Sequence, residues 1–136
     1  MIKDFLIVGM GSFLGGGLRL VVSRFVDTHA AALALRLPLP AAYGIPAGTL
    51  AVNVLGCLAI GFLSGLHPVG APLPQQVRVF LTTGFCGGFT TFSTFISENS
   101  AMMREDNFTG IAAYITVSLA LGFGALMIGN WAARMV

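Results

Sequence analysis

The chain has 136 residues, of which 56% are hydrophobic and only 9% are charged, with a formal net charge of +2. Soluble domains carry about 25% charged residues, so this composition excludes a water-covered globular domain and indicates an integral membrane protein. No basic patch suited to nucleic acid is found in the sequence, and nucleic acid is not an expected partner. The uncharged stretches are also too long for a membrane β-barrel, whose strands have about 10 alternating residues.

Four apolar segments follow one another along the chain, each long enough to cross a bilayer as a helix, which takes about 20 residues. The first contains Arg19, Arg24 and Asp27 in its second half, whereas the second has no charged residue. A short turn at 104–106 separates the third from the fourth. We expect one all-α integral membrane domain, residues 1–136, with four transmembrane helices. The predicted spans are residues 5–34, 44–66, 75–103 and 107–133.

Lys and Arg residues favour neither orientation of these spans, although their bias in short loops normally sets the orientation. Two explanations stay open. The rule is uninformative for so small a protein, or the chain inserts both ways and the two orientations pair as an antiparallel dimer. The balance is Lys3, Arg78 and Arg134 on the side of the termini against Arg24, Arg36 and Arg104 on the other side.

Glycines spaced by four residues indicate where helices approach one another closely. Glycine is common in membrane helices, and with 18 glycines in the chain some such pairs arise by chance. The pairs are Gly11/Gly15, Gly44/Gly48, Gly61/Gly65 and Gly84/Gly88.

Two cysteines, Cys57 and Cys86, lie inside predicted spans, and neither belongs to a CxxC motif or lies close to a histidine. They are expected to be small apolar filling residues. The sequence shows no nucleophile–base pair and no phosphate-binding loop. We therefore expect a protein that is not an enzyme.

The stretch GGFTTFSTF, residues 87–95, places phenyl rings and hydroxyls inside an uncharged span. On a continuous helix Phe85, Phe89 and Phe92 share one face, and the hydroxyls fall on the neighbouring face. That pattern fits an ordinary packing seam, in which the hydroxyls bond to carbonyls one turn earlier. The ring motif is therefore compatible with both packing and a site.

The residues between these rings are poor helix formers, because Gly87 and Gly88 are followed by the β-branched Thr90 and Thr91. A break would free backbone polar groups at membrane depth, where they are tolerated only inside protein or beside a polar cavity. Broken helices are also a recurrent way to bind ions near the middle of a bilayer. These residues weaken the packing interpretation.

Asn53 lies in the middle of the cleanest apolar span. Its amide offers two donors, and polar residues inside membranes often mark a site, although a helix–helix hydrogen bond is an equally good explanation. A phenyl ring has a positive edge that favours anions. Ring edges, hydroxyls and an amide together make a neutral path for a small anion. No buried ionisable residue is expected beside the ring motif.

The segments GTLAVNVLG (48–56) and GFCGGFTTFSTF (84–95), supported by LGGGLR (14–19), resemble the Fluc family of fluoride channels, also called CrcB. The resemblance implies an antiparallel homodimer of four-helix subunits with the third helix broken. It implies insertion in both orientations in the cytoplasmic membrane, with a second copy and membrane lipids as partners. Fluoride would leave the cell passively through two pathways related by the two-fold axis of the dimer.

The resemblance also assigns residues to this pathway. The rings of Phe92 and Phe95 would line it, with Asn53 as donor, and Arg19 would lie near the aqueous vestibule. The backbone carbonyls of Gly87 and Thr90 would hold a structural Na+ on the dimer axis. Two residues depart from the family pattern, Phe89 and Gly122, the latter standing where a serine can continue the polar track. The implied polar track is Thr49, Thr94, Tyr114 and Ser118.

Two other functions compete with this interpretation. A small multidrug/proton antiporter is also a four-span dual-topology dimer, but it needs a membrane-embedded carboxylate. Asp4 and Asp27 lie near the ends of the first span, which leaves Glu98 as the one deeper candidate. A non-transporting membrane assembly protein would account for the glycines, but it would leave Asn53 without a purpose.

Overall fold

The computed structural model describes residues 1–33, 43–66 and 73–135. This part of the chain has four helices that are long and apolar enough to cross a membrane, and it contains no β-strand. The predicted all-α protein with four membrane-capable helices is therefore confirmed. Residue 34, the expected end of the first span, and Arg36 lie outside the described residues.

The third membrane-capable segment is composite, whereas the other three are single α-helices. It contains a π-helical segment, η2, which sequence propensity did not indicate. The elements are α1 (Ile2–Leu33), α3 (Ala47–Gly65), α4 (Gln75–Val79), η2 (Phe80–Cys86), α5 (Gly87–Phe89), α6 (Phe92–Arg104) and α7 (Phe108–Ala133).

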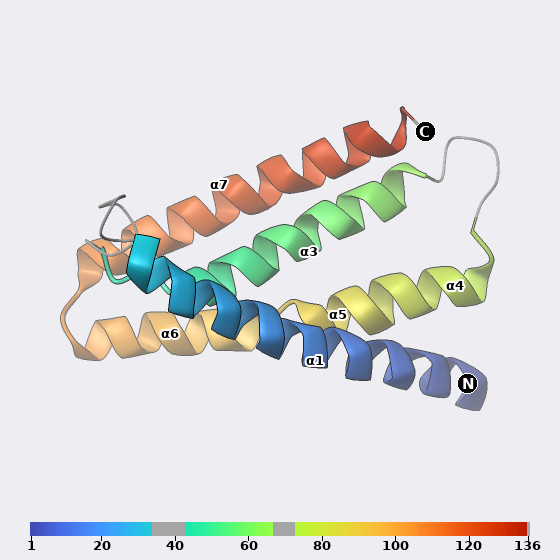
Figure 1. The fold of residues 1–136 in the computed structure, drawn as a ribbon, viewed down its shortest axis with the longest axis horizontal. Coiled ribbons are helices and arrows are strands. Elements are labelled where there is room, and N and C mark those ends of the chain that lie inside the picture. The colour runs from blue at the N-terminus through green and yellow to red at the C-terminus, as the bar shows by residue number, and fades with distance from the viewer. Residues whose placement is uncertain (34–42, 67–72, 136) are drawn as a thin grey trace.

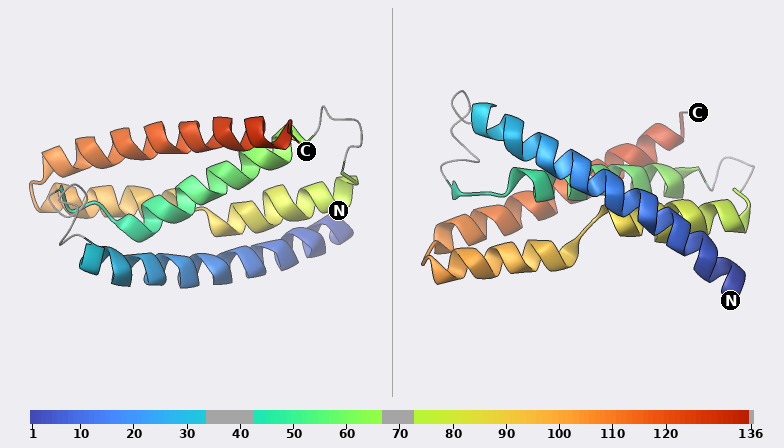
Figure 2. Two further views of the ribbon diagram at one scale, coloured as in Figure 1. Left: turned by 45° about the horizontal axis from the view of Figure 1, so that its top comes forward. Right: turned by 60° about the horizontal axis from the view of Figure 1, so that its bottom comes forward.

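The helices form an elongated bundle in which α1 starts and α7 ends at the same end of the molecule (Figure 1). Helices α3 and α7 run side by side in the same direction and make the most extensive contact of the fold (Figures 1 and 2). Helix α1 crosses the third segment, where it packs against η2 and α5. The bundle therefore has two main contacts, α3 with α7 and α1 with η2 and α5.

Glycines let the backbones of α1 and the third segment touch. A Cβ added at Gly11 would lie 2.6 Å from the Phe80 carbonyl oxygen, and one added at Gly88 would lie 2.6 Å from the Ser12 carbonyl oxygen. Side chains at these positions would push the helices apart. The predicted pairs Gly11/Gly15 and Gly84/Gly88 thus face each other, as close-packed membrane helices require.

The glycine pairs of α3 had different outcomes. A Cβ at Gly61 would overlap the Leu126 carbonyl oxygen, and one at Gly65 would lie 2.6 Å from the Asn130 carbonyl oxygen, so this pair does face α7. The prediction that Gly44 and Gly48 form such a pair on one helix was wrong, because Gly44 precedes α3 and has a positive φ of 67°. Glycine is favoured in that left-handed conformation, which costs other residues energy.

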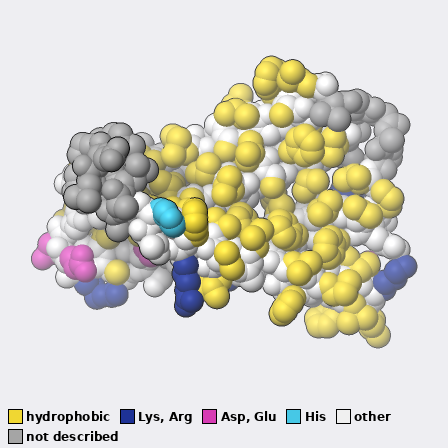
Figure 3. All heavy atoms as spheres, viewed as in Figure 1, with side chains coloured by type: hydrophobic (Ala, Val, Ile, Leu, Met, Phe, Trp, Pro, Cys, Tyr) yellow, Lys and Arg dark blue, Asp and Glu magenta, His cyan; other side chains and the backbone are white. Residues whose placement is uncertain are grey.

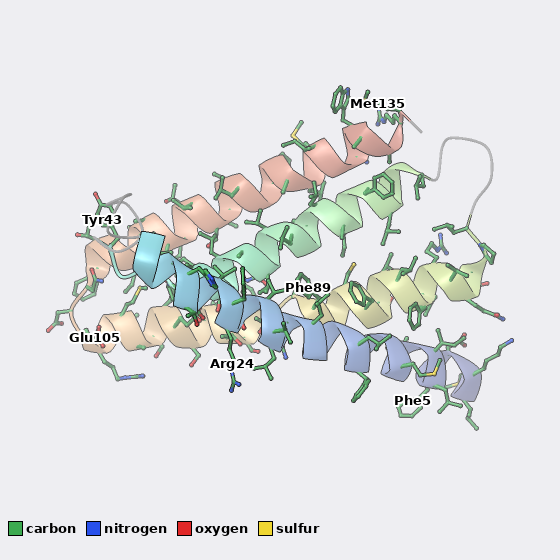
Figure 4. The ribbon with its side chains drawn as sticks, viewed as in Figure 1. Phe5, Arg24, Tyr43, Phe89, Glu105 and Met135 are labelled. Carbon is green, nitrogen blue, oxygen red and sulfur yellow. The ribbon has the colours of Figure 1, made fainter. Side chains whose placement is uncertain are left out.

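The third segment is interrupted at Thr90 and Thr91, whose backbones are extended (φ −82°, ψ 159° and φ −149°, ψ 114°). The expected stripe of rings does not continue across this point. Phe89 is 6% exposed and points into the bundle (Figure 4), whereas Phe92 is 75% exposed. The prediction that Phe92 shares a helix face with Phe85 and Phe89 was wrong, because helical spacing relates residues only within one uninterrupted helix.

Apolar side chains cover much of the outer surface. Ile2, Phe13 and Phe5 are each at least 75% exposed, and hydrophobic side chains spread over most of the face in Figure 3, while the acidic side chains in view gather at one end. Arg24, near that end, points away from the bundle (Figure 4). Such a surface is suited to lipid rather than to water.

Candidate functional site

The interruption in the third segment is held by the side chain of Asn53 on α3. Its Nδ2 donates to the Thr91 carbonyl oxygen at 3.1 Å, and its Oδ1 accepts from the Thr91 backbone N–H at 2.8 Å. One amide therefore replaces the helical partners of an extended residue inside the bundle, where unpaired backbone groups are costly. Because an amide nitrogen carries two hydrogens, one N–H of Asn53 is left for another acceptor.

Thr91 then starts the next helix. Its Oγ1 accepts from the Thr94 backbone N–H at 3.2 Å, as an N-cap does, and donates to Thr94 Oγ1 at 2.8 Å. A threonine cap of this kind stabilises a helix start by about 1 kcal/mol. Thr91 is not among the site residues predicted from the sequence, because its role depends on where the helix stops.

Two backbone amides are thereby diverted from their usual acceptors. In a continuous α-helix the Thr91 and Thr94 amides would bond the carbonyls four residues earlier, which are those of Gly87 and Thr90. Here they bond to Asn53 Oδ1 and Thr91 Oγ1 instead. The Gly87 and Thr90 carbonyls therefore lose their helical donors, and they are the two carbonyls assigned above to Na+.

A carboxylate also lies in this region. Glu98 on α6 accepts from Thr49 Oγ1 at 2.5 Å and from the Tyr114 hydroxyl at 2.8 Å. The Tyr114 ring packs on Phe95, with ring centroids 4.8 Å apart. Glu98 is half-buried, so an ionisable side chain does lie beside the ring motif, where the sequence predicted no buried one. Helical spacing carried the signal, since Glu98 is one turn beyond Phe95 and the helix is continuous there.

A first pocket, of about 370 Å³, opens between α1, α3 and α6. It brings together Arg19, Thr49 and Thr94, which are far apart in the sequence, and Thr91 also lines it. Its charged group is the guanidinium of Arg19. The Thr49 and Thr91 hydroxyls already donate to Glu98 and Thr94, which leaves the O–H of Thr94 to donate to an anion. We call this the vestibule pocket.

A second pocket, of about 380 Å³, lies against the other side of Thr91. Asn53, Phe92, Phe95 and Ser118 all line it, together with Cys57 on α3. The two rings have centroids 6.0 Å apart and are tilted by 33° to each other. We call this the ring pocket; polar groups and ring surfaces face the same space in it.

The structure thus gathers the predicted site residues into two neighbouring pockets that share Thr91. Tyr114 lines neither, but it joins them through Glu98, which it shares with Thr49. Phe85 lies apart, stacked on Phe89 with centroids 6.1 Å apart. The described residues hold no group of three His, Cys, Asp or Glu side chains able to bind a metal.

Comparison with known proteins gives consistent matches over almost the whole chain. A family model described as "CrcB-like protein, Camphor Resistance (CrcB)" matches residues 6–130. A relative from Chlorobium phaeobacteroides is 39% identical over 134 residues, covering 98% of this chain and 95% of its own. Relatives from Hyphomonas neptunium (41% identical, 98% of both chains) and Chlorobaculum tepidum (38% identical, 99% and 98%) are similar. All three are named "Fluoride-specific ion channel FluC".

Proposed function

Since the chain belongs to the CrcB-like family, we propose that it is a channel through which fluoride crosses the cytoplasmic membrane passively. The observation that carries this proposal is the meeting of the vestibule pocket and the ring pocket at Thr91, beside a free N–H of Asn53. The names of the relatives agree with it. Neutral hydrogen fluoride enters a cell from an acidic exterior and dissociates inside, so a passive anion path lets the trapped fluoride leave.

The proposed path runs from the vestibule pocket to the ring pocket. Arg19 attracts the anion without contacting the rings, because it lines only the vestibule pocket. The remaining Asn53 N–H and the edges of Phe92 and Phe95 then receive it, since ring edges carry partial positive charge. These groups bind weakly enough for the ion to leave again, which conduction requires.

We further propose that two copies form an antiparallel homodimer surrounded by lipid. Phe92 is 75% exposed on one chain although it lines the ring pocket, so a second copy is needed to close the pocket on that side. The even distribution of Lys and Arg between the two sides supports insertion in both orientations. Each dimer would then carry two equivalent paths.

A structural Na+ fits the interruption. The carbonyls of Gly87 and Thr90 have lost their helical donors, and such oxygens at membrane depth need partners. The Thr90 hydroxyl donates to the Cys86 carbonyl oxygen at 2.9 Å and therefore points back along its own helix. The carbonyl oxygen of Thr90, rather than its hydroxyl, is then the atom available to Na+. When bound, the ion neutralises the mutual repulsion of these carbonyl dipoles.

The sodium proposal is tested by dialysis of the purified protein into a large organic cation. We expect the dimer to lose thermal stability and to regain it when Na+ is restored. Thr90→Ser, which keeps the main-chain oxygen, should show the same Na+ dependence. An unchanged melting temperature without Na+ would remove the ion from the proposed assembly.

Fluoride conduction is tested in liposomes loaded with fluoride and made permeable to a counter-cation by an ionophore. The protein should release fluoride, whereas chloride-loaded vesicles should keep their contents. The reversal potential in a fluoride gradient should not move when a pH gradient is added. A reversal potential that follows the proton gradient would overturn the channel and favour the antiporter, with Glu98 as its carboxylate.

A further inference from the structure

Polar side chains form a regular ladder along the contact between α3 and α7. The two helices run in the same direction (Figure 2), so residues four apart on each helix meet in successive rungs. The contacts of Gly61 with Leu126 and of Gly65 with Asn130 fix this register at one end. The rung before them, the third, is Cys57 with Gly122. Continued by the same spacing, the register makes the second rung Asn53 with Ser118, which both line the ring pocket. The first rung is then Thr49 with Tyr114, which both donate to Glu98.

The second rung has an unused hydroxyl. Ser118 lines the ring pocket, and its Oγ is buried without a hydrogen-bond partner among the described residues. Leaving a buried polar atom unpaired costs free energy, unless something that enters the pocket bonds to it. Ser118 Oγ thus points to a polar occupant at this level of the ladder.

In the third rung the absence of a side chain at Gly122 leaves room for the Cys57 thiol. A Cβ added at Gly122 would lie 3.4 Å from Cys57 Sγ, so a side chain at 122 would crowd the sulfur. Cys57 is half-buried and not in a disulfide, and it lines the ring pocket together with Ser118. Beyond it the ladder offers no polar side chain at the next rung, where Gly61 packs against the Leu126 backbone.

We infer that Cys57 is the outermost polar group of the fluoride path, with its S–H as the donor that follows Ser118. A thiol is a weak donor, which suits the position where the anion must be released. This inference rests on the proposed fluoride conduction and adds a residue to it. On this inference the Cys57 thiol does more than the apolar filling that the sequence predicts for it.

The test uses methyl methanethiosulfonate on the full-length protein. The thiol sulfur attacks the sulfenyl sulfur, forming the mixed disulfide and releasing methanesulfinic acid with the thiol proton. Cys86→Ala leaves Cys57 as the one thiol, and Cys57→Ala leaves Cys86, which is 1% exposed. We expect one adduct by mass spectrometry on the Cys86→Ala protein and none on the Cys57→Ala protein. The adduct should slow fluoride release about tenfold, the equivalent of about 1.4 kcal/mol.

Substitutions of Cys57 distinguish a hydrogen-bond donor to fluoride from a side chain that only fills space. Cys57→Ser keeps a donor, whereas Cys57→Ala removes it and should release fluoride about tenfold more slowly than the Ser variant. Gly122→Ser added to Cys57→Ala places a hydroxyl in the vacated space and should restore release. Melting temperatures and elution volumes should be equal across these variants.

Several results would overturn the inference. An unlabelled Cys57, an adduct that leaves release unchanged, or equal release by the Ser and Ala variants would each remove Cys57 from the path. In all three cases the unsubstituted protein still releases fluoride, so the proposed function survives. Unsubstituted protein that holds its fluoride would instead overturn that function, and the path with it.

Discussion

The two halves of the third membrane-capable segment are built differently. Before Thr90, η2 and α5 contact α1 through backbone atoms, at Gly84 and Gly88. After Thr91, α6 is tied to its neighbours by polar side chains, above all through Glu98. The first half is therefore held mainly by close packing, with one hydrogen bond from Ser12 Oγ to the Gly84 carbonyl oxygen at 3.3 Å, and the second half mainly by side-chain hydrogen bonds. A single segment can thus anchor itself in the bundle and also present rings and donors to an ion.

This contrast predicts that the two halves fail in different ways. Substitutions that widen the contact of α1 with the first half should prevent folding. Substitutions of the rings and donors that line the ring pocket beside the second half should change fluoride release, and loss of the helix cap between the halves should cost a little stability. The variants below test that difference, from the largest expected effect to the smallest.

Gly15→Val should prevent folding. A Cβ at Gly15 would overlap the Phe85 carbonyl oxygen and lie 2.8 Å from the Phe89 backbone nitrogen. Backbone atoms cannot yield as side chains do, so the cost should exceed the about 3 kcal/mol of ordinary overpacking. Size-exclusion chromatography should show little monodisperse protein. Gly17→Val is the matched control, because its added Cβ would meet no other helix within 4 Å among the described residues. Equal behaviour of the two variants would contradict the role given to close packing.

Asn53→Asp should abolish fluoride release while the protein still folds. A carboxylate loses the donors to the Thr91 carbonyl and to fluoride, and if ionised it repels an anion strongly where the dielectric constant is low. Asn53→Ala removes the donors without adding charge and should be less severe. The liposome assay compares the two. Release by the Asp variant at the unsubstituted rate would show that Asn53 serves only as a clamp on Thr91.

Phe92→Ile and Phe95→Ile should each slow fluoride release about tenfold or more, about 1.4 kcal/mol for each factor of ten. Isoleucine occupies much of the same space but has no positive edge. Phe85→Ile is the control from the first half of the segment, because Phe85 stacks on Phe89 outside the ring pocket. It should lower the melting temperature and leave release nearly unchanged. Full release by both ring variants would place the path elsewhere.

Thr91→Ala should have the smallest effect, a loss of about 1 kcal/mol of stability from the missing helix cap. Thr91→Ser keeps the hydroxyl and should therefore keep the stability of the unsubstituted protein. Thermal unfolding in detergent measures the difference between the two variants. If they melt at the same temperature, the Thr91 hydroxyl does not contribute to the start of α6.

Much of the fold follows from the sequence, because apolar length alone predicts four membrane-capable helices. The spacing of Gly11/Gly15 and Gly84/Gly88 also predicted a contact that the structure has, since small residues on facing helices let the backbones approach closely. The segment η2 was not predicted, because a π-helical turn depends on tertiary contacts rather than on local propensity. Gly44 was misassigned because spacing alone does not show where a helix begins.

For the site, the residues were easier to predict than their contacts. Asn53 was recognised as an intramembrane polar group, but its two bonds to Thr91 depend on the exact end of α5. The sequence predicts Glu98 only as a carboxylate for an antiporter, and its place one turn beyond Phe95 becomes informative only once α6 is known to be continuous there. The diverted amides of Thr91 and Thr94 follow from three-dimensional geometry that no local pattern contains. The roles of Phe92, Phe95 and Arg19 stay predictions.

The location of both helix ends, where α1 starts and α7 finishes, limits how two copies can be joined in one gene. Both lie at the same end of the bundle (Figure 1), so in the proposed antiparallel pair the end of α7 in one copy and the start of α1 in the next would face opposite sides of the bilayer. A short flexible linker would force the copies into the same orientation and should give an inactive protein. A working tandem fusion needs one additional crossing helix of about 20 residues between the copies.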